Sequence, residues 1–203
     1  MTWGNGIVET RPVVSLLSEG KPMLTELQKR KLTKLFSMHD AKFDGALAYH
    51  DFENIIKKLA ALRHWGSRSP RYQILLNNCN RTWEELKRDA DITHNKKVSL
   101  EEWLAYYSII LNDEEKYMHN IHFFMELVFE VFDKDGDGKI SQSEWAGLLS
   151  VYNVSPVYAP RVFPKLDTNQ DGFLTKEEVL QLIREFFYSD NPEAPANEMF
   201  GPY

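Results

Sequence analysis

Apolar residues recur along the chain at the three- and four-residue spacing of amphipathic helices, and short polar loops interrupt this spacing four times. The loops begin at Asp40, Asp91, Asp133 and Asp167, and apolar residues at helical spacing flank each of them. The pattern therefore repeats one plan, which is a helix, a loop and a second helix. We predict an all-α fold of four such units in two pairs, with a short antiparallel β ladder between the two loops of each pair.

Loop spacing and the distribution of glycine and proline divide the chain into four parts. Residues 1–22 hold glycine and proline without sustained periodicity, and we expect them to form an N-terminal arm. An insertion around residues 62–80 lengthens the first pair, and the helix before the third loop is expected to run unbroken over 115–132. The predicted parts are an arm, an N-terminal pair, a C-terminal pair and a tail, at residues 1–22, 23–112, 113–188 and 189–203.

The C-terminal tail combines helix-breaking and apolar residues. Prolines at positions 192, 195 and 202 prevent a helix there. Met199, Phe200 and Tyr203 are apolar enough to insert into a groove of the protein itself. We therefore expect the tail to pack on the core and to fill the surface where a target helix would otherwise bind.

The third loop, residues 133–144, has the residue types of a calcium-binding EF-hand loop. Ca²⁺ takes six to eight oxygen ligands, and a twelve-residue EF-hand loop supplies them from positions 1, 3, 5, 7, 9 and 12. Gly138 at position 6 permits the left-handed backbone that the sharp turn requires. Each ligand position holds a suitable group, namely Asp133, Asp135, Asp137, the main-chain carbonyl of Lys139, Ser141 and Glu144.

The fourth loop, residues 167–178, is also complete. Gly172 stands at its turn, and Leu174 stands at position 8, where the third loop has Ile140. In paired loops the two residues at position 8 lie side by side, so we expect Ile140 and Leu174 to couple the two sites. The ligands of this loop are Asp167, Asn169, Asp171, the carbonyl of Phe173, Thr175 and Glu178.

The second loop, residues 91–102, offers oxygen at every ligand position but fewer carboxylates. Lys96 occupies the glycine position, which costs on the order of 1 kcal/mol if its φ is forced positive. Occupancy of this loop is left open. Its candidate ligands are Asp91, Thr93, Asn95, the carbonyl of Lys97, Ser99 and Glu102.

The first loop, residues 40–51, departs furthest from the calcium pattern. Lys42 replaces the ligand at position 3, Ala48 has no oxygen in its side chain, and Asp51 is shorter than the usual glutamate. A shorter carboxylate reaches the ion less easily with both oxygens, which favours Mg²⁺ or no ion. We expect two or three calcium ions in all, with Mg²⁺ as the alternative ion in the weaker loops.

Composition changes this picture little but excludes several classes of protein. A formal net charge of −6 disfavours nucleic-acid binding. No apolar run approaches the roughly 20 residues of a membrane span. The one cysteine, Cys79, weakly favours a reducing compartment, so we expect a cytoplasmic protein.

Two stretches carry a resemblance to a known family. ADITHNKKVSLEEWLAYY at 90–107 and FFYSDNPEAPANEMFGPY at 186–203, together with the lengthened first pair, make the chain similar to the sarcoplasmic calcium-binding proteins and calexcitins. That resemblance implies a compact monomer with four EF-hands that buffers cytosolic calcium. For calexcitin it implies instead a sensor that acts on a protein target. The six methionines do not cluster as a sensor groove would suggest, which favours the buffer.

The chain also looks like the coelenterazine-binding proteins and calcium-triggered photoproteins. Its 13% aromatic content and the pairs Glu102-Trp103 and Glu144-Trp145 carry this likeness. It implies a luciferin-binding protein or an oxygenase. Photoproteins place a histidine of the C-terminal hand beside the luciferin, and this chain has no histidine after His122. We therefore expect no enzyme activity, and we expect the tryptophans to belong mainly to the core.

Overall fold

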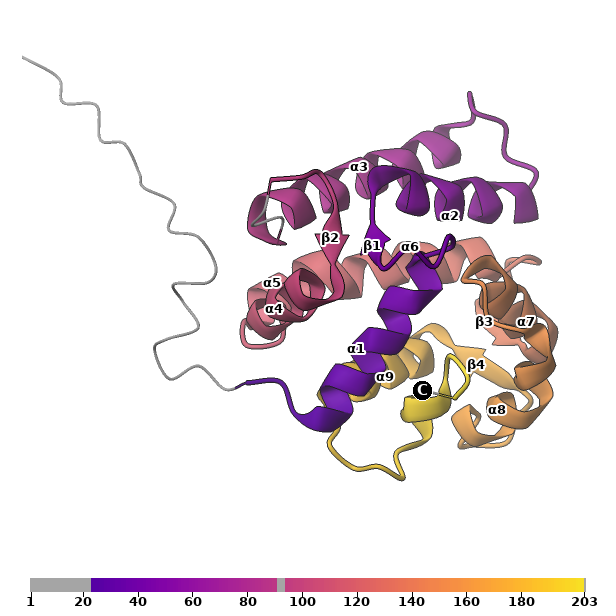
Figure 1. The fold of residues 1–203 in the computed structure, drawn as a ribbon. Coiled ribbons are helices and arrows are strands. Elements are labelled where there is room, and N and C mark those ends of the chain that lie inside the picture. Colours follow the sequence, from indigo (N-terminus) through magenta and orange to yellow (C-terminus); the bar gives the residue numbers. More distant parts are fainter. Residues whose placement is uncertain (1–22, 91–93, 203) are drawn as a thin grey trace, which may run out of the picture.

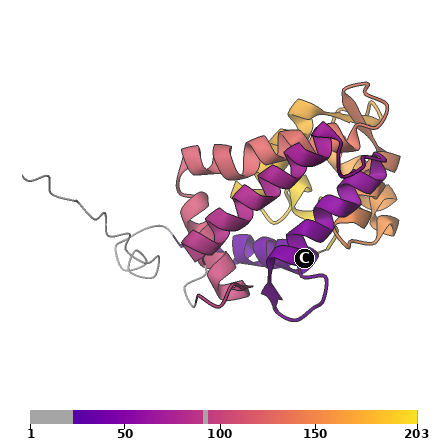
Figure 2. The same cartoon turned by 90° about the horizontal axis from the view of Figure 1, so that it is seen from above.

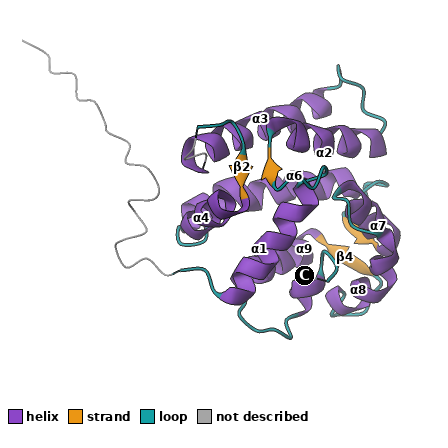
Figure 3. Cartoon of the chain, in the orientation of Figure 1, coloured by secondary structure: helices purple, strands orange, loops and turns teal. Residues whose placement is uncertain are grey.

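The computed structural model describes residues 23–90 and 94–202 of the chain (Figure 1). The expected arm at 1–22 lies outside the described residues. Within them the regular structure is almost entirely helical, and the strands are two or three residues long (Figure 3). The arrangement confirms the predicted all-α fold of helix-loop-helix units in two pairs.

The N-terminal pair holds the first two loops. Helices α2 and α3 lie side by side, at the top of Figure 1 and facing the viewer in Figure 2. The insertion seen in the sequence covers the corner between them and the first half of α3. The elements of this pair are α1 (Glu26–His39), β1 (Ala46–Leu47), α2 (Tyr49–Leu62), α3 (Pro70–Ala90), β2 (Val98–Ser99) and α4 (Leu100–Ile110).

The C-terminal pair holds the third and fourth loops and is followed by a tail that contains one short 3₁₀ turn. Its elements are α5 (Glu114–Tyr117), a π-helical turn (Met118–His122), α6 (Phe123–Phe132), β3 (Lys139–Ser141), α7 (Gln142–Val151), a 3₁₀ turn (Pro156–Tyr158), α8 (Ala159–Leu166), β4 (Phe173–Thr175), α9 (Lys176–Tyr188) and the 3₁₀ turn of the tail (Pro195–Glu198).

The expected unbroken helix over 115–132 is wrong in one respect. A π-helical turn at Met118–His122 separates α5 from α6. Such a turn accommodates one more residue than an α-helical turn, so it shifts which faces of the helix before and after it are buried. Apolar spacing alone did not reveal this shift, because apolar residues continue on both sides of the turn.

Each pair of loops is joined by a short antiparallel ladder. In the first ladder Leu47 lies opposite Val98. In the second, Ile140 lies opposite Leu174, and both side chains are buried. The predicted position of Ile140 beside Leu174 is therefore confirmed.

One apolar core runs through both pairs. Helix α1 contacts α4 of its own pair and α9 of the other, and it lies between them in Figure 1. Trp83, Trp103 and Trp145 are buried in this core, and Trp65 packs against it at the edge. None of the helices in residues 23–90 and 94–202 combines the length and apolar character that a membrane crossing needs.

Candidate functional site

The third loop gathers three aspartates at the end of α6. Asp133 closes that helix, and its carboxylate accepts the main-chain N–H groups of Gly136, Asp137 and Gly138 at 2.7 to 3.1 Å. Carboxylate oxygens of Asp133, Asp135 and Asp137 lie within 4.8 Å of one another. Three like charges at this separation repel, and a divalent cation between them removes the repulsion. The donor set is all oxygen, which suits calcium.

Glu144 is already turned toward the third loop. Its Oε1 accepts the N–H of Lys134 at 2.7 Å, and its Oε2 accepts the N–H and hydroxyl of Ser141 at 2.8 and 2.7 Å. Ser141 is at the same time the N-cap of α7, in a reciprocal capping box with Glu144. The residues at positions 9 and 12 therefore begin the exiting helix as well as face the site.

This second role of positions 9 and 12 was not predicted, although the sequence contains a motif that indicates it. A serine or threonine followed three residues later by a glutamate is the capping-box motif. The structure has this motif at the second, third and fourth loops, as Ser99 with Glu102, Ser141 with Glu144, and Thr175 with Glu178.

The fourth loop contains an orphaned oxygen where a cation would lie. Asp167 is buried, and its Oδ2 accepts the N–H of Gly172 at 2.8 Å, but its Oδ1 has no hydrogen-bond partner. A buried carboxylate oxygen without a donor is costly unless a cation compensates it. Asn169 donates its amide to Glu178 Oε1 at 2.8 Å, so these two predicted ligands already face each other. This loop therefore also fits a divalent ion.

The structure describes only part of the second loop. Asp91 and Thr93 lie outside the described residues. Glu102 accepts the N–H and hydroxyl of Ser99 at 2.9 and 3.0 Å, as Glu144 does with Ser141. Lys96 has a φ of 62°, which is the left-handed backbone expected to be costly at this position.

Polar and charged side chains of the N-terminal pair stand beside the carboxylates of the first loop. Asp51 is buried, its Oδ2 accepts the N–H of Ala48 at 2.9 Å, and its Oδ1 lies 3.2 Å from His50 Nε2 without a hydrogen-bond partner among the described residues, as Asp167 Oδ1 does in the fourth loop. Lys97 of the second loop lies 3.5 Å from Asp44. The N–H of Ala46 is the main cause that lowers the pKa of Asp44. With Lys42 at a ligand position as well, this loop has the weakest field for a divalent cation.

Two positions have a left-handed backbone in all four loops. The sixth position has a positive φ of 62° to 88°, and so does the fourth, at 53° to 77°. Sequence reasoning did not single out position 4, because only one loop has glycine there. The four residues at position 4 are Phe43, His94, Gly136 and Gln170.

An arginine of the N-terminal pair reaches the third loop. The guanidinium of Arg63, at the end of α2, donates to the main-chain carbonyl of Asp133 at 2.5 Å. Arg63 and Arg71 both lie over the ring of Trp65, and Arg71 lies 3.3 Å from Glu130 of α6. The corner between α2 and α3 therefore contacts the entering helix of the third loop, which sequence spacing could not indicate.

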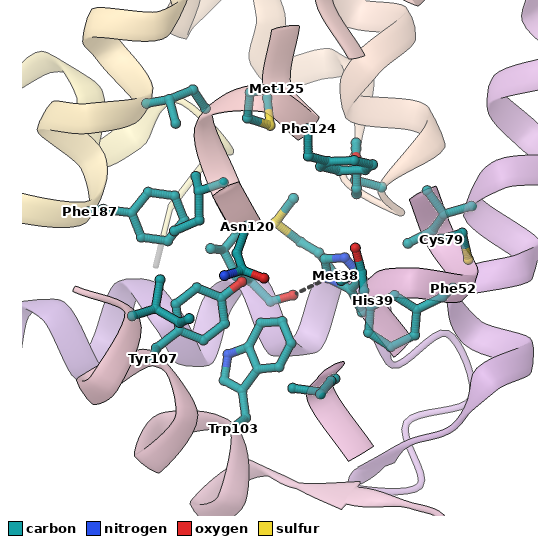
Figure 4. A pocket seen from close by; sticks show the side chains of 18 of the residues that line it. Met38, His39, Phe52, Cys79, Trp103, Tyr107, Asn120, Phe124, Met125 and Phe187 are labelled. Carbon is teal, nitrogen blue, oxygen red and sulfur yellow. Dashed lines mark hydrogen bonds between the residues drawn. The ribbon is translucent and has the colours of Figure 1, made fainter. Parts of the chain in front are cut away.

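Beneath the loops lies an apolar cavity of about 110 Å³ (Figure 4). His39, Trp103 and Tyr107 line one side, with ring centroids 5.7 Å apart for the first two and 4.6 Å for the last two. His39 donates its Nδ1–H to the main-chain carbonyl of Leu35 at 2.8 Å, because a carbonyl oxygen can only accept. Burial lowers the pKa of His39 and raises that of Tyr107. The cavity is thus neutral and aromatic.

Comparison with known proteins agrees with these loops. The family model described as EF hand matches residues 125–149 and 161–183, which contain the third and fourth loops. Calerythrin of Saccharopolyspora erythraea is 24% identical over 168 residues, which are 82% of this chain and 95% of calerythrin. Calexcitin-1 of Caenorhabditis elegans is 23% identical over 178 residues, covering 85% of each chain.

A solved structure shares the fold over most of the chain. The sarcoplasmic calcium-binding protein from amphioxus superposes with a TM-score of 0.68 and 21% identity, covering 89% of this chain and 99% of that one. The comparisons confirm the resemblance that the two sequence stretches indicated. They leave the individual ligands of each loop as predictions.

Proposed function

We propose that this chain, a calcium-binding EF-hand protein of the type of the sarcoplasmic calcium-binding proteins, calexcitin and calerythrin, works as a calcium buffer. The observation that carries the proposal is the convergence of Asp133, Asp135 and Asp137 within 4.8 Å, with Glu144 turned toward them. A site assembled in this way needs little rearrangement to take an ion. Little rearrangement is the behaviour of a buffer, whereas a sensor opens on binding.

We assign the two strongest sites to the third and fourth loops. The third carries four carboxylates, and the fourth has the unpartnered oxygen of Asp167. The second loop is the candidate for a third ion, since Glu102 accepts the N–H of Ser99 as Glu144 accepts that of Ser141. Mg²⁺ is the alternative ion for the two weaker loops.

We also propose where the protein works and with what partners. We place the protein in the cytoplasm as a monomer, without a nucleic-acid partner. Cys79 is buried, and burial raises the pKa of its thiol to about 12, so it stays protonated and unreactive in any compartment near neutral pH. A thiol of this kind needs no disulfide partner.

Calorimetric titration with calcium tests the assignment. We expect Glu144→Gln and Glu178→Gln each to remove one strong site, and the double variant to remove both. The buffer role is tested with an apolar dye, because a buffer should bind similar amounts of dye with and without calcium. Strong calcium-dependent dye binding, together with capture of a protein target only in calcium, would favour the calexcitin-type sensor instead.

A second candidate function is the binding of a small aromatic molecule, as in the luciferin-binding proteins. The observation that favours it is the grouping of His39, Trp103 and Tyr107 around one cavity. The sequence argument looked for a histidine only in the C-terminal hand and so did not consider His39. A cavity of about 150 Å³ holds benzene, so the 110 Å³ present here must expand to hold a luciferin. A spectral titration with coelenterazine tests this candidate.

A further inference from the structure

The C-terminal tail is docked on the protein through its side chains. Ala196, Met199 and Phe200 are almost completely buried, while positions 190–193, which connect them to α9, are exposed. The main-chain N–H groups that begin or follow the 3₁₀ turn bond within the tail itself. They belong to Ala194, Asn197, Met199 and Gly201, and their acceptors are Asn191, Ala194, Ala196 and Glu198.

A buried lysine of α1 holds the polar part of the tail. Lys31 is only 1% exposed, and its ammonium donates to the carbonyl of Ser189 at 2.8 Å and to Asn197 Oδ1 at 3.2 Å. The ammonium also lies 5.5 Å from the centre of the Phe186 ring. Burying a charge is costly unless donors and acceptors are matched. The side chain of Asn197 is therefore bound by a specific group, the ammonium of Lys31, and not only by apolar contact.

Other tail residues also meet specific partners. Glu198 pairs with Lys165 of α8 at 2.8 Å, and the ring of Phe200 packs edge-on against Phe186 of α9. Gly201 has a φ of +79°, and a Cβ there would lie 3.3 Å from the ring of Tyr158. The surface formed by α1, α8, α9 and the 3₁₀ turn at Pro156–Tyr158 thus contacts an amide, an acid, a large apolar residue and a glycine of the tail, within the run Asn-Glu-Met-Phe-Gly.

We propose that this surface is a peptide-recognition site and that the chain's own tail, residues 194–201, is its ligand. The contacts are those of a bound peptide, because side chains provide the recognition and the connecting residues 190–193 are exposed. Phe200 also lines the cavity beside His39 and Trp103. The tail therefore covers apolar surface at one end of the core, and a peptide with the same motif competes with it for this surface. The inference goes beyond calcium binding and does not depend on it.

The test uses the full chain with a protease site inserted between Ser189 and Asp190, so that the carbonyls of Asn191 and Pro192, which accept the amide of Asn197 at 2.8 and 3.1 Å, stay with the tail. After cleavage we expect the tail to stay bound through gel filtration, and an excess of labelled synthetic peptide 190–203 to replace it. A Lys31→Met variant should bind the labelled peptide at least tenfold more weakly. Lys29→Met is the matched control on the same helix, because the ammonium of Lys29 pairs with the exposed Glu26 and not with the tail.

Variants of the peptide keep the test valid if Lys31→Met fails to fold, since the protein itself is then unchanged. Peptides with Asn197→Ala or Gly201→Ala should bind at least tenfold more weakly, and Pro202→Ala, at an exposed position, should bind as the parent does. Absence of peptide binding to the cleaved, folded protein would overturn the proposal. So would equal affinity of all the peptides. A dimer of the uncleaved chain would overturn the assignment of the surface to the chain's own tail and assign it to that of a second copy.

Discussion

The two pairs of hands share a backbone but differ in their chemistry. Both have an antiparallel ladder with buried residues at position 8, and all four loops have a positive φ at positions 4 and 6. The third loop fills its ligand positions with four carboxylates, whereas the first places Lys42 and Ala48 there. Loop geometry is therefore kept where the ligands for calcium are lost. The difference teaches that the fold of a hand and its ability to hold an ion are separate properties of the sequence.

The largest effect that separates the pairs should follow removal of calcium. Without an ion the carboxylates of the third loop repel, so the C-terminal pair should loosen first. At a free calcium concentration 100 times Kd each ion adds about 2.7 kcal/mol, so two ions add roughly 5 kcal/mol to the free energy of unfolding. Hydrogen exchange with and without a chelator measures this for α1–α4 and for α6–α9 separately. Equal loss of protection in both pairs would contradict the comparison.

A smaller effect should appear where the first pair meets the tail. Burial lowers the pKa of Lys31 to about 8 from 10.5, despite the opposing charges of Asp190 and Glu185. Between these values the unfolded chain holds a proton that the folded chain has lost, so stability should rise with pH from about 8 to 10.5. At 1.36 kcal/mol for each pKa unit, the gain approaches about 3 kcal/mol.

The contribution of Lys31 is isolated by comparison with Lys31→Met. Denaturant unfolding at several pH values gives the free energy of both proteins, and the other titrating groups cancel in the difference. We expect the difference, wild type minus variant, to increase above pH 8 and to stay constant below it. A difference that is flat across the whole range would show that Lys31 titrates normally.

Substitution of the last ligand should distinguish the loops in calcium affinity. Glu144→Gln removes one charge and one good ligand oxygen from the third loop, and we expect roughly a hundredfold weaker binding there, or about 2.7 kcal/mol. Asp51→Asn is the matched change in the first loop, and it should leave the calcium stoichiometry unchanged. Calorimetric titration of both variants measures this. Loss of a calcium site in Asp51→Asn would show that the first loop binds calcium after all.

The smallest effect concerns the second loop. Its ligand positions suit calcium better than those of the first loop and less well than those of the third. Lys96→Gly should relieve the left-handed backbone at φ 62° and strengthen calcium binding or stability by about 1 kcal/mol. Lys96→Ala is the control, since it removes the charge but keeps the Cβ. If alanine gives the same gain as glycine, charge rather than backbone strain limits this loop.

Much of the fold could be predicted because the loop chemistry is local. Twelve consecutive residues specify a loop, and the position of Ile140 opposite Leu174 follows from their shared place in it. The π-helical turn at Met118–His122 was not predicted, since it depends on how two helical faces pack. Tertiary contacts such as Lys31 with Asn197 join residues far apart in the sequence, and no periodicity indicates them.

The candidate sites also differ in whether they depend on local sequence or on how the helices pack. Candidate ligand positions in the third and fourth loops follow from residue types alone, and they stay predictions. In the third loop the structure places the carboxylates of Asp133, Asp135 and Asp137 within 4.8 Å of one another. The grouping of His39 with Trp103 and Tyr107 could not be located, because it depends on α1 crossing α4. His39 lies immediately before the first loop, and nothing in the sequence pattern gave it a role.

The corner between α2 and α3 has a consequence for how long an ion stays bound. In the sequence it is an insertion that lengthens the first pair, but in the fold Arg63 of this corner donates to the carbonyl of Asp133. We expect an ion that leaves the third loop to move Asp133 and so to disturb a contact that belongs to the other pair. On this expectation the residence time of calcium in the third loop depends partly on residues of the N-terminal pair, whose loops we propose to bind calcium less tightly.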